Sequence, residues 1–413
     1  MEYQVYTLPN GLRLLHHPVN SNITHCCIVI NAGSRDEKPG QDGLAHFIEH
    51  LIFKHTKRRN TSQILNRLEL VGADLNAYTT KEYTCVHASF LNEHLERTLD
   101  LFEDIVFHST FPENEIEKER GVILDEIASY LDQPEEAIQD DFEGLLFEGH
   151  SMGCNILGAP ESVSALSQQN IKDFIAENYL PSQIVIGVSG KYPPAKLTKL
   201  AEKYFGHLAS SVPDKKRVAP PVSKPQLVKA AKPINQTHCI MGLQAYPSNH
   251  PLKSALLLLN NLLGGMGMSS RLNMEIREKY GIAYTIESSY VPFTDTGIFN
   301  IYFGTDAEKA ERALKLVGKE LKKLRDNKLG TIQLQQAKQK FCGQIALAEE
   351  GRMSLVISMT KSLLDFNRVD SLDEVMAKIN AVTADELLEI SNELLDESKM
   401  VTLIFEPEEE TKS

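Results

Sequence analysis

The chain has 413 residues, beyond the roughly 250–300 at which a single hydrophobic core stops growing, so at least two domains are expected. Acidic residues outnumber basic ones, 56 to 43, and the resulting net charge of −13 disfavours a nucleic-acid binder. No apolar run approaches the roughly 20 residues of a membrane-spanning helix, and the N-terminal residues lack the features of a signal peptide. We therefore expect a cytoplasmic protein without a membrane partner, although a processed precursor would have the same features.

The first predicted elements are a strand over residues 24–33 (THCCIVINAG) and a helix over residues 43–53 (GLAHFIEHLIF). His46 and His50 are four residues apart, so both imidazoles lie on one face of the helix and can reach one ion. The carboxylate of Glu49 can lie close to an ion bound by His46 and His50 without being a ligand of that ion. The pattern H-x-x-E-H is the inverted motif of zinc peptidases, and a pair of core histidines hydrogen-bonded to Glu49 is the alternative interpretation.

The next informative element is an amphipathic helix predicted within residues 111–134 (FPENEIEKERGVILDEIASYLDQP). Glu119 and Glu126 fall on its apolar stripe, about two turns apart, and an inward-facing carboxylate needs a partner. We expect Glu126 to complete a His₂Glu zinc site with His46 and His50, and Glu119 to orient one of the histidines. A buried salt bridge to Arg or Lys is the alternative for the two glutamates.

Two segments of similar pattern flank a stretch rich in Pro and Lys (residues 210–233), which predicts an extended linker. The strand after it, residues 237–246 (THCIMGLQAY), resembles the opening strand of the first half. Each half also ends with an amphipathic helix and a closing strand. In the second half, however, the counterpart of the histidine-bearing helix is nearly all Leu and Asn (SALLLLNNLLGG, residues 254–265).

These similarities predict an α+β fold made by internal duplication. Each copy is expected to be an α/β sandwich, a mostly antiparallel sheet with helices packed on it. The predicted organisation is an N-terminal zinc-binding catalytic domain (residues 1–212), a linker (213–233) and a C-terminal domain of similar fold (234–413).

Taken together, these motifs resemble one known family. The segment His46-Phe47-Ile48-Glu49-His50, followed 76 positions after His50 by Glu126, is similar to the inverzincin peptidases. That family includes pitrilysin, insulin-degrading enzyme and the mitochondrial processing peptidase. The resemblance covers nearly the whole chain, and the matching segments include TLPNGLRLL (residues 7–15), GADLNAYTTKEYT (72–84) and GMSSRLNMEIREKYGIAY (267–284).

For the metal centre, the resemblance implies that His46, His50 and Glu126 bind one Zn²⁺ per chain. It implies that Glu49 is the general base that activates a water molecule. It also implies that Glu119 is a nearby acidic residue that supports the site without binding the metal. The ligand set and the position of Glu119 agree with those expected above from the two helices, whereas the role of Glu49 as general base comes from the resemblance.

For substrate binding, the resemblance implies that Asn76 and Ala77 belong to an edge strand to which an extended peptide adds as a further strand. It also implies that Arg277 and Tyr284, in the C-terminal domain, contact the substrate carbonyl. Without the resemblance, Arg277 would be interpreted as an ordinary helix-face charge and Tyr284 as a packed strand residue.

The length of the chain bears on its assembly. Some family members carry four such units and enclose their substrate in a chamber, whereas this chain has two, as in the half-length processing-peptidase branch. We therefore expect a homodimer in which Arg277 and Tyr284 of one chain serve the zinc of its partner. The predicted function is a zinc-dependent endopeptidase that hydrolyses peptides or unfolded segments inside a closed chamber. The alternatives are a non-catalytic structural or partner subunit of a processing-peptidase-like complex, and a metal hydrolase acting on another substrate.

Overall fold

The computed structural model describes residues 3–210 and 215–408, which form two compact units. Unit 1 contains the residues up to Ala128 together with Cys154–Arg217 and Leu347–Ser371. Unit 2 contains Ser129–Gly153, Val218–Ala346 and the residues from Leu372 onward. Within the described ranges, no helix has the length and apolar character needed to cross a membrane.

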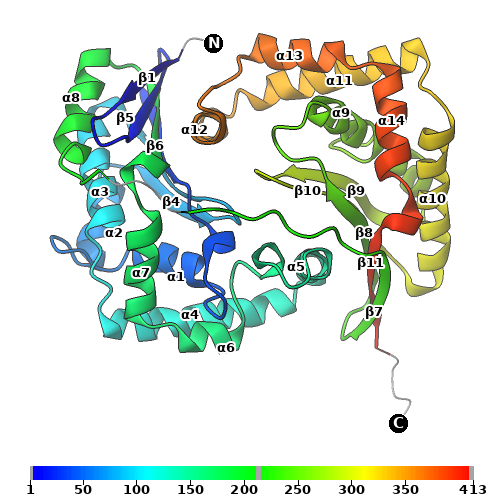
Figure 1. Ribbon diagram of the computed structural model, residues 1–413, viewed down its shortest axis with the longest axis horizontal. Helices are drawn as coiled ribbons and strands as arrows, with labels where there is room; N and C mark the ends of the chain where they lie inside the picture. Colours follow the sequence, from blue (N-terminus) through cyan, green and yellow to red (C-terminus); the bar gives the residue numbers. More distant parts are fainter. Residues whose placement is uncertain (1–2, 211–214, 409–413) are drawn as a thin grey trace. The chain divides into compact units, whose positions relative to one another are not determined.

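Unit 1 is built on a six-stranded sheet with the order β1-β2-β6-β3-β5-β4 (Figure 1). Its strands are β1 (Gln4–Thr7), β2 (Arg13–Pro18), β3 (Ile23–Ile30), β4 (Asp74–Thr79), β5 (Thr84–Leu91) and β6 (Ile184–Gly190). Its helices are α1 (Leu44–Leu51), α2 (Thr61–Glu69), α3 (Leu95–Phe107), α4 (Glu113–Leu131, whose last turn belongs to unit 2), α6 (Pro160–Ala165), α7 (Gln168–Asn178), α8 (Pro194–Phe205) and α12 (Arg352–Phe366).

Unit 2 is built on a five-stranded sheet with the order β7-β11-β8-β10-β9. Its strands are β7 (Gln226–Lys232), β8 (Thr237–Ala245), β9 (Ala283–Pro292), β10 (Gly297–Thr305) and β11 (Val401–Pro407). Its helices are α5 (Pro134–Leu146), α9 (Lys253–Leu263), α10 (Ala310–Asp326), α11 (Thr331–Ala348, whose last residues belong to unit 1), α13 (Leu372–Ala381) and α14 (Ala384–Leu394).

The two sheets share one topology. In unit 1, β2 is parallel to β6, and the pairs β6–β3, β3–β5 and β5–β4 are antiparallel. In unit 2, β7 is parallel to β11, and β11–β8, β8–β10 and β10–β9 are antiparallel. Strand β1 is an addition to the first copy. The predicted fold, two α+β units of mostly antiparallel sheet with packed helices, is confirmed.

The central strands β6 and β10 are buried on both faces, which explains why their sequences are mostly apolar, whereas the outer strands β1, β4, β7 and β9 have exposed residues. In β3, Cys26 and Ile28 face the main core of unit 1, while Cys27 and Val29 face the opposite side, as the two-residue period of a strand requires. The opposite side is covered by α12, whose Val356 packs against these two residues.

The covering helices are exchanged between the halves of the sequence. Helix α12 comes from the C-terminal half but packs on β6 and β3 of unit 1. Helix α5 comes from the N-terminal half but packs on β11 and β8 of unit 2. Its residues Ile138, Phe142 and Leu146 recur every four positions and form the apolar face that the sheet of unit 2 buries.

The division into units therefore differs from two uninterrupted halves of the sequence. The predicted boundary between residues 212 and 213 lies outside the described residues. Residues 226–232 of the predicted linker form strand β7, which pairs with β11. Its exposed face carries Lys229, and its half-buried face carries Gln226 and Lys232 beside Val228 and Ala230. Its composition therefore resembles that of a linker.

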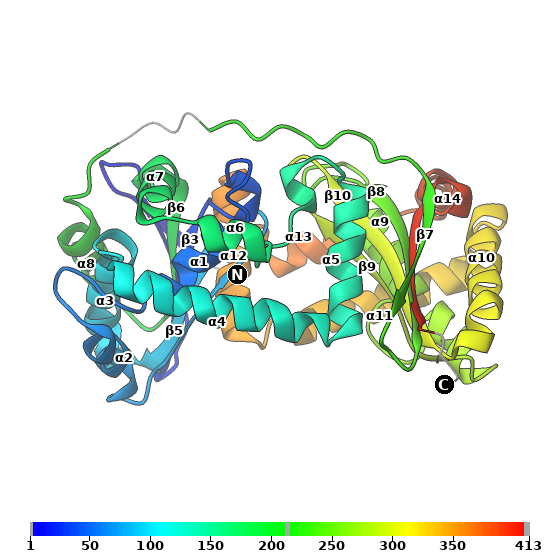
Figure 2. The ribbon, with the colours of Figure 1, turned by 90° about the horizontal axis from the view of Figure 1, so that it is seen from below.

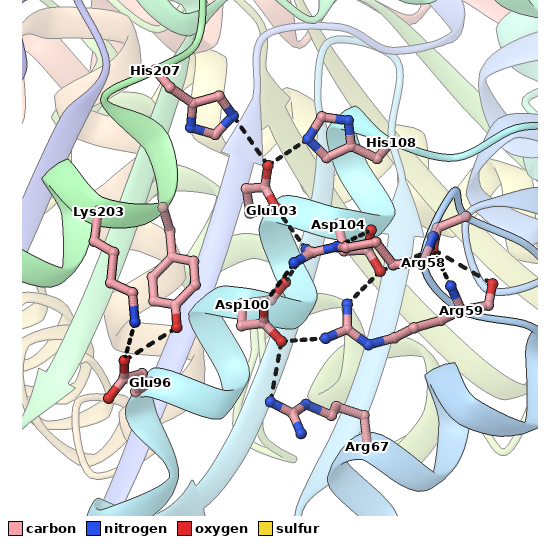
Figure 3. A network of polar contacts seen from close by, with 12 residues as sticks. Arg58, Arg59, Arg67, Glu96, Asp100, Glu103, Asp104, His108, Lys203 and His207 are labelled. Atoms are coloured by element: carbon pink, nitrogen blue, oxygen red, sulfur yellow. Dashed lines mark hydrogen bonds and ion pairs between the residues drawn. The ribbon is translucent and has the colours of Figure 1, made fainter.

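A dense ion-pair network fixes α3 in unit 1 (Figure 3). Arg58 lies 3.0 Å from Asp100, 2.8 Å from Glu103 and 2.9 Å from Asp104, all on α3. Arg59 also pairs with Asp100 and Asp104. Burial by itself would raise the pKa of Asp104, but the hydrogen bonds from Arg58 and Arg59 outweigh it and hold the pKa below its usual value. The network stabilises the ionised carboxylate.

Replacement of Asp104 by Asn is expected to lower the free energy of unfolding by about 2 kcal/mol at pH 7, because it removes charge-assisted hydrogen bonds from a fully buried carboxylate. Since the pKa of Asp104 is depressed in the folded state, its contribution is complete above the unfolded pKa of about 3.9 and is lost as the pH falls through the folded value. Urea denaturation at pH 7 and pH 3 tests this, with the exposed Asp173→Asn as control. Equal effects of the two substitutions, or no decrease of the Asp104 effect at pH 3, would contradict it.

Candidate metal centre and active site

Helix α1 carries the paired histidines and begins at a capped N-terminus. Gly43 precedes it with φ = 93°, a left-handed conformation that favours glycine. The buried carboxylate of Glu37 accepts hydrogen bonds from the backbone N–H of Gly43 (3.0 Å) and Ala45 (2.7 Å). This side chain therefore satisfies two N–H groups that the first turn of a helix leaves unpaired, and it fixes the direction of α1.

The predicted pair, His46 and His50, lies on one face of α1, with ring centroids 4.6 Å apart. Helix α4 passes beside α1 (Figure 2) and brings Glu126 to the same point. Glu126 Oε2 lies 3.9 Å from His46 Nε2 and 3.6 Å from His50 Nε2. Ligand atoms of the three residues lie within 4.8 Å of one another. Three donors around a tetrahedral zinc, each at 2.0–2.2 Å, are separated by roughly 3.3 Å, so only small side-chain movements are needed to fit the ion.

The protonation states also suit a cation. Burial, reinforced by the charge of His50, lowers the pKa of His46 to about 4, so this imidazole is neutral at pH 7 and keeps a lone pair for a metal. The side chain of Glu126 is 35% exposed, more than the predicted inward-facing position implies. The site therefore has a buried side, formed by His46, and a side open to solvent.

Glu119, the second predicted carboxylate of α4, is 2% exposed. Its Oε2 lies 3.3 Å from His50 Nδ1, and its Oε1 lies 2.8 Å from Lys54 Nζ. It thus contacts the histidine, as predicted, and also forms the buried salt bridge that was the alternative. A carboxylate on Nδ1 leaves Nε2 of His50 as the nitrogen available to a metal.

Glu49 lies beside the three donors and is not one of them. Thr79 Oγ1, at the end of β4, donates a hydrogen bond to Glu49 Oε2 at 2.6 Å. Burial raises the pKa of Glu49; the Thr79 hydrogen bond and the charge of His50 oppose this rise, and the charge of Glu126 adds to it. A carboxylate whose pKa is shifted towards neutrality is a stronger proton acceptor.

Asn76 and Ala77 lie on β4, which is an edge strand of the unit 1 sheet and pairs only with β5 among the described residues. The predicted edge position is confirmed. A cavity of about 360 Å³ lies between this strand and the site and is lined by Glu49, His50, Phe53, Lys54, Leu65, Glu69, Ala73, Asp74, Leu75, Asn76 and Glu119.

The structure places Arg277 and Tyr284 in unit 2. Arg277 is exposed on a π-helical segment (Asn273–Glu278). Tyr284 is the second residue of β9 and is 54% exposed; its hydroxyl donates a hydrogen bond to Asp306 Oδ1 at 3.0 Å, which raises the pKa of the tyrosine. Tyr284 is therefore not the packed strand residue of the alternative interpretation.

Sequence reasoning did not identify Lys54, Thr79 or Glu37. Lys54 follows His50 by four residues, a spacing that could have indicated it. Thr79 and Glu37 are recognisable only once β4 and the loop before α1 are placed against the helix, because nothing in their local sequence distinguishes them.

The chain is similar to known proteins over nearly its whole length. Residues 14–159 match the family model "Insulinase (Peptidase family M16)", and residues 165–341 match "Peptidase M16 inactive domain". The chain is 31% identical over 405 residues, 97% of each chain, to the "Uncharacterized zinc protease YmxG" of Bacillus subtilis (strain 168). It is also 31% identical over 396 residues, 94% of this chain and 88% of the relative, to the "Uncharacterized zinc protease ML0855" of Mycobacterium leprae (strain TN).

Solved structures show the same fold. A protease from Helicobacter pylori superimposes with a TM-score of 0.90 at 22% identity, over 98% of this chain and 100% of that one. A Pseudomonas fluorescens structure described as a peptidase M16 inactive domain has a TM-score of 0.91 at 22% identity, over 99% and 98% of the two chains. The relatives support a peptidase-like role, and the predicted resemblance is confirmed: the chain belongs to Peptidase family M16.

Proposed function

We propose that this protein is a zinc-dependent endopeptidase that hydrolyses extended peptides or unfolded segments. The observation that carries the proposal is the convergence of His46, His50 and Glu126 on one point, with Glu49 beside them and the edge strand β4 alongside. The names of the relatives, zinc proteases, support the choice of metal. Two imidazoles, one carboxylate and an open fourth position are the ligand set of catalytic zinc.

The residues of the chain then have distinct tasks. His46, His50 and Glu126 would hold one zinc ion, which when bound polarises the substrate carbonyl and acidifies the attacking water. Glu49 would accept a proton from that water at Oε1 and deliver it to the leaving amine. The Thr79 hydrogen bond to the other oxygen, Oε2, keeps the carboxylate in place during both transfers.

Strand β4 would bind the substrate. Addition of an extended peptide to an edge strand supplies main-chain hydrogen bonds without regard to sequence, which suits an enzyme that acts on unfolded segments. Side chains of the peptide alternate in direction, so one of them can enter the cavity beside Asn76, where Phe53, Leu65 and Leu75 supply apolar surface.

The non-catalytic alternative has one point in its favour, because the model matched by residues 165–341 is described as an inactive domain. That range, however, contains none of His46, Glu49, His50 and Glu126, all of which lie in the range matched by the insulinase model. The description therefore applies to the copy in which the histidine-bearing helix has become the apolar α9.

Cleavage of a mixed library of unfolded peptides, with cut sites identified by mass spectrometry, tests the proposed function. We expect internal cleavage that is lost on removal of metal with a chelator and restored by zinc. Absence of cleavage by protein that binds zinc would favour the non-catalytic subunit instead.

We propose further that the protein is a homodimer and that Arg277 and Tyr284 of one chain contact the substrate bound at the zinc site of its partner. Tyr284 is exposed and carries a hydroxyl donor, so it can reach a group outside its own unit. A donor of this kind would stabilise the negative charge that develops on the substrate carbonyl.

Mixing two inactive variants tests this arrangement. Random exchange of Glu49→Gln and Tyr284→Phe chains makes half of the dimers mixed, and each mixed dimer regains one complete site. We therefore expect about a quarter of the wild-type activity per site. Activity no greater than the sum of the separate variants would show that Tyr284 does not act in trans.

A further inference from the structure

A second group of side chains that could hold a metal ion lies in unit 1 and shares no residue with the group of His46, His50 and Glu126. Glu103 is on α3, His108 is the residue that ends this helix, and His207 follows the end of α8. Among the residues that the structure describes, this group and the group of His46, His50 and Glu126 are the ones whose His, Cys, Asp or Glu ligand atoms converge closely enough to hold a metal ion.

Both imidazoles face the same carboxylate oxygen (Figure 3). Glu103 Oε1 lies 2.5 Å from His108 Nε2 and 3.4 Å from His207 Nε2. The two rings are nearly parallel, at 9°, with centroids 6.2 Å apart, compared with 4.6 Å for His46 and His50. The 3.4 Å separation already suits two ligands of one ion, while the 2.5 Å contact is a hydrogen bond that has to widen by less than about 1 Å.

The carboxylate is held in the orientation that a metal ligand needs. Glu103 is buried, and its other oxygen, Oε2, accepts a hydrogen bond from Arg58 Nη2 at 2.8 Å. Arg58 is fixed in turn by Asp100 and Asp104. Hydrogen bonds to the second oxygen of a ligating carboxylate are a regular feature of metal sites, because they set its direction.

One carboxylate oxygen accepts from both imidazoles only when each ring is in the tautomer that carries its proton on Nε2. In the other tautomer both Nε2 lone pairs face the same oxygen without a donor between them. A dication at this point binds both lone pairs and the carboxylate oxygen at once. His207 has a side chain that is 55% exposed, so an ion can enter from solvent and water can complete its coordination.

We propose that Glu103, His108 and His207 bind a second divalent metal ion, zinc or a similar transition metal. This ion would link the C-terminal end of α3 to the residues that follow α8. Imidazole and carboxylate ligands in this number are suited to zinc and its neighbours in the first transition series. The side chain of His207 is 55% exposed and must lose its freedom of movement on binding, so this ion is held more weakly than one at His46, His50 and Glu126. The site is separate from the proposed peptidase centre and does not depend on its activity.

Zinc binding to metal-free full-length protein, measured by equilibrium dialysis, tests this proposal. The wild-type chain is expected to bind two zinc ions, one tightly and one at least tenfold more weakly. His207→Gln should bind only the tight ion, whereas His50→Gln should lose the tight ion and keep the weak one. The two variants therefore separate failure of this proposal from failure of the proposed peptidase centre.

His94→Gln is the matched control, because His94 also pairs with a single carboxylate, that of Glu93 at 3.4 Å, but belongs to no converging metal-ligand group among the described residues. This variant should bind two zinc ions. Circular dichroism and urea denaturation of the metal-free variants establish that each is folded. A wild-type chain that binds one ion, a weak ion that persists in both His207→Gln and His108→Gln, or a weak ion that is lost equally in His94→Gln would overturn the proposal.

Discussion

Replacement of Glu49 by Gln is expected to lower kcat by about 10²–10⁴-fold while leaving the zinc content unchanged. The amide has the same shape and can still accept the hydrogen bond from Thr79, but it cannot take a proton from water. Because Glu49 is not among the three converging donors, metal affinity should not change. Peptide hydrolysis and zinc content, measured on the same preparation, check both parts.

The outcome separates two roles for Glu49. If the variant loses activity and zinc together, Glu49 contributes to holding the metal and the base has to be sought elsewhere. If it keeps both, Glu49 is not the proton acceptor, and the account of the mechanism fails at that residue.

Replacement of Glu126 by Gln is expected to weaken zinc binding by more than about 100-fold, because a neutral amide oxygen replaces the only anionic donor of the group. Activity should be absent at low zinc and should partly return when zinc is added in excess. No such rescue is expected for Glu49→Gln. The two substitutions are therefore distinguished by their response to zinc.

Glu113→Gln provides the matched control, since Glu113 is an exposed glutamate in the first turn of the same helix, α4. It should leave zinc affinity unchanged. Wild-type zinc affinity in Glu126→Gln would mean that the third ligand has been assigned to the wrong carboxylate, with Glu119 as the next candidate.

Two parts of the site can be predicted from sequence because each depends on the periodicity of one helix. The four-residue spacing of His46 and His50 places both on one face of α1, and the seven-residue spacing of Glu119 and Glu126 places both on the apolar stripe of α4. These are local relations, and they hold wherever the helices pack.

Contacts between elements are not encoded in this way. The hydrogen bond from Thr79 to Glu49 exists because the end of β4 packs on α1, and the pairing of Lys54 with Glu119 exists because α4 passes beside the end of α1. The degree of burial of Glu126 likewise depends on what covers the site.

The exchange of α5 and α12 shows the same limit at the level of the fold. The spacing of Ile138, Phe142 and Leu146 predicts an amphipathic helix, but it contains no information on which of two similar sheets will cover its apolar face. Two copies of one topology offer nearly equivalent surfaces, and three-dimensional packing decides between them.

The most direct test of the proposed function is titration of metal-free protein with zinc while hydrolysis of an unfolded peptide is followed. If His46, His50 and Glu126 form the catalytic centre, activity should rise in proportion to added zinc and stop rising at one ion per chain. Later additions, including any ion that binds at Glu103, His108 and His207, should not increase it further. Hydrolysis that is already maximal without metal, or that stays absent when the tight site is filled, would contradict the proposal.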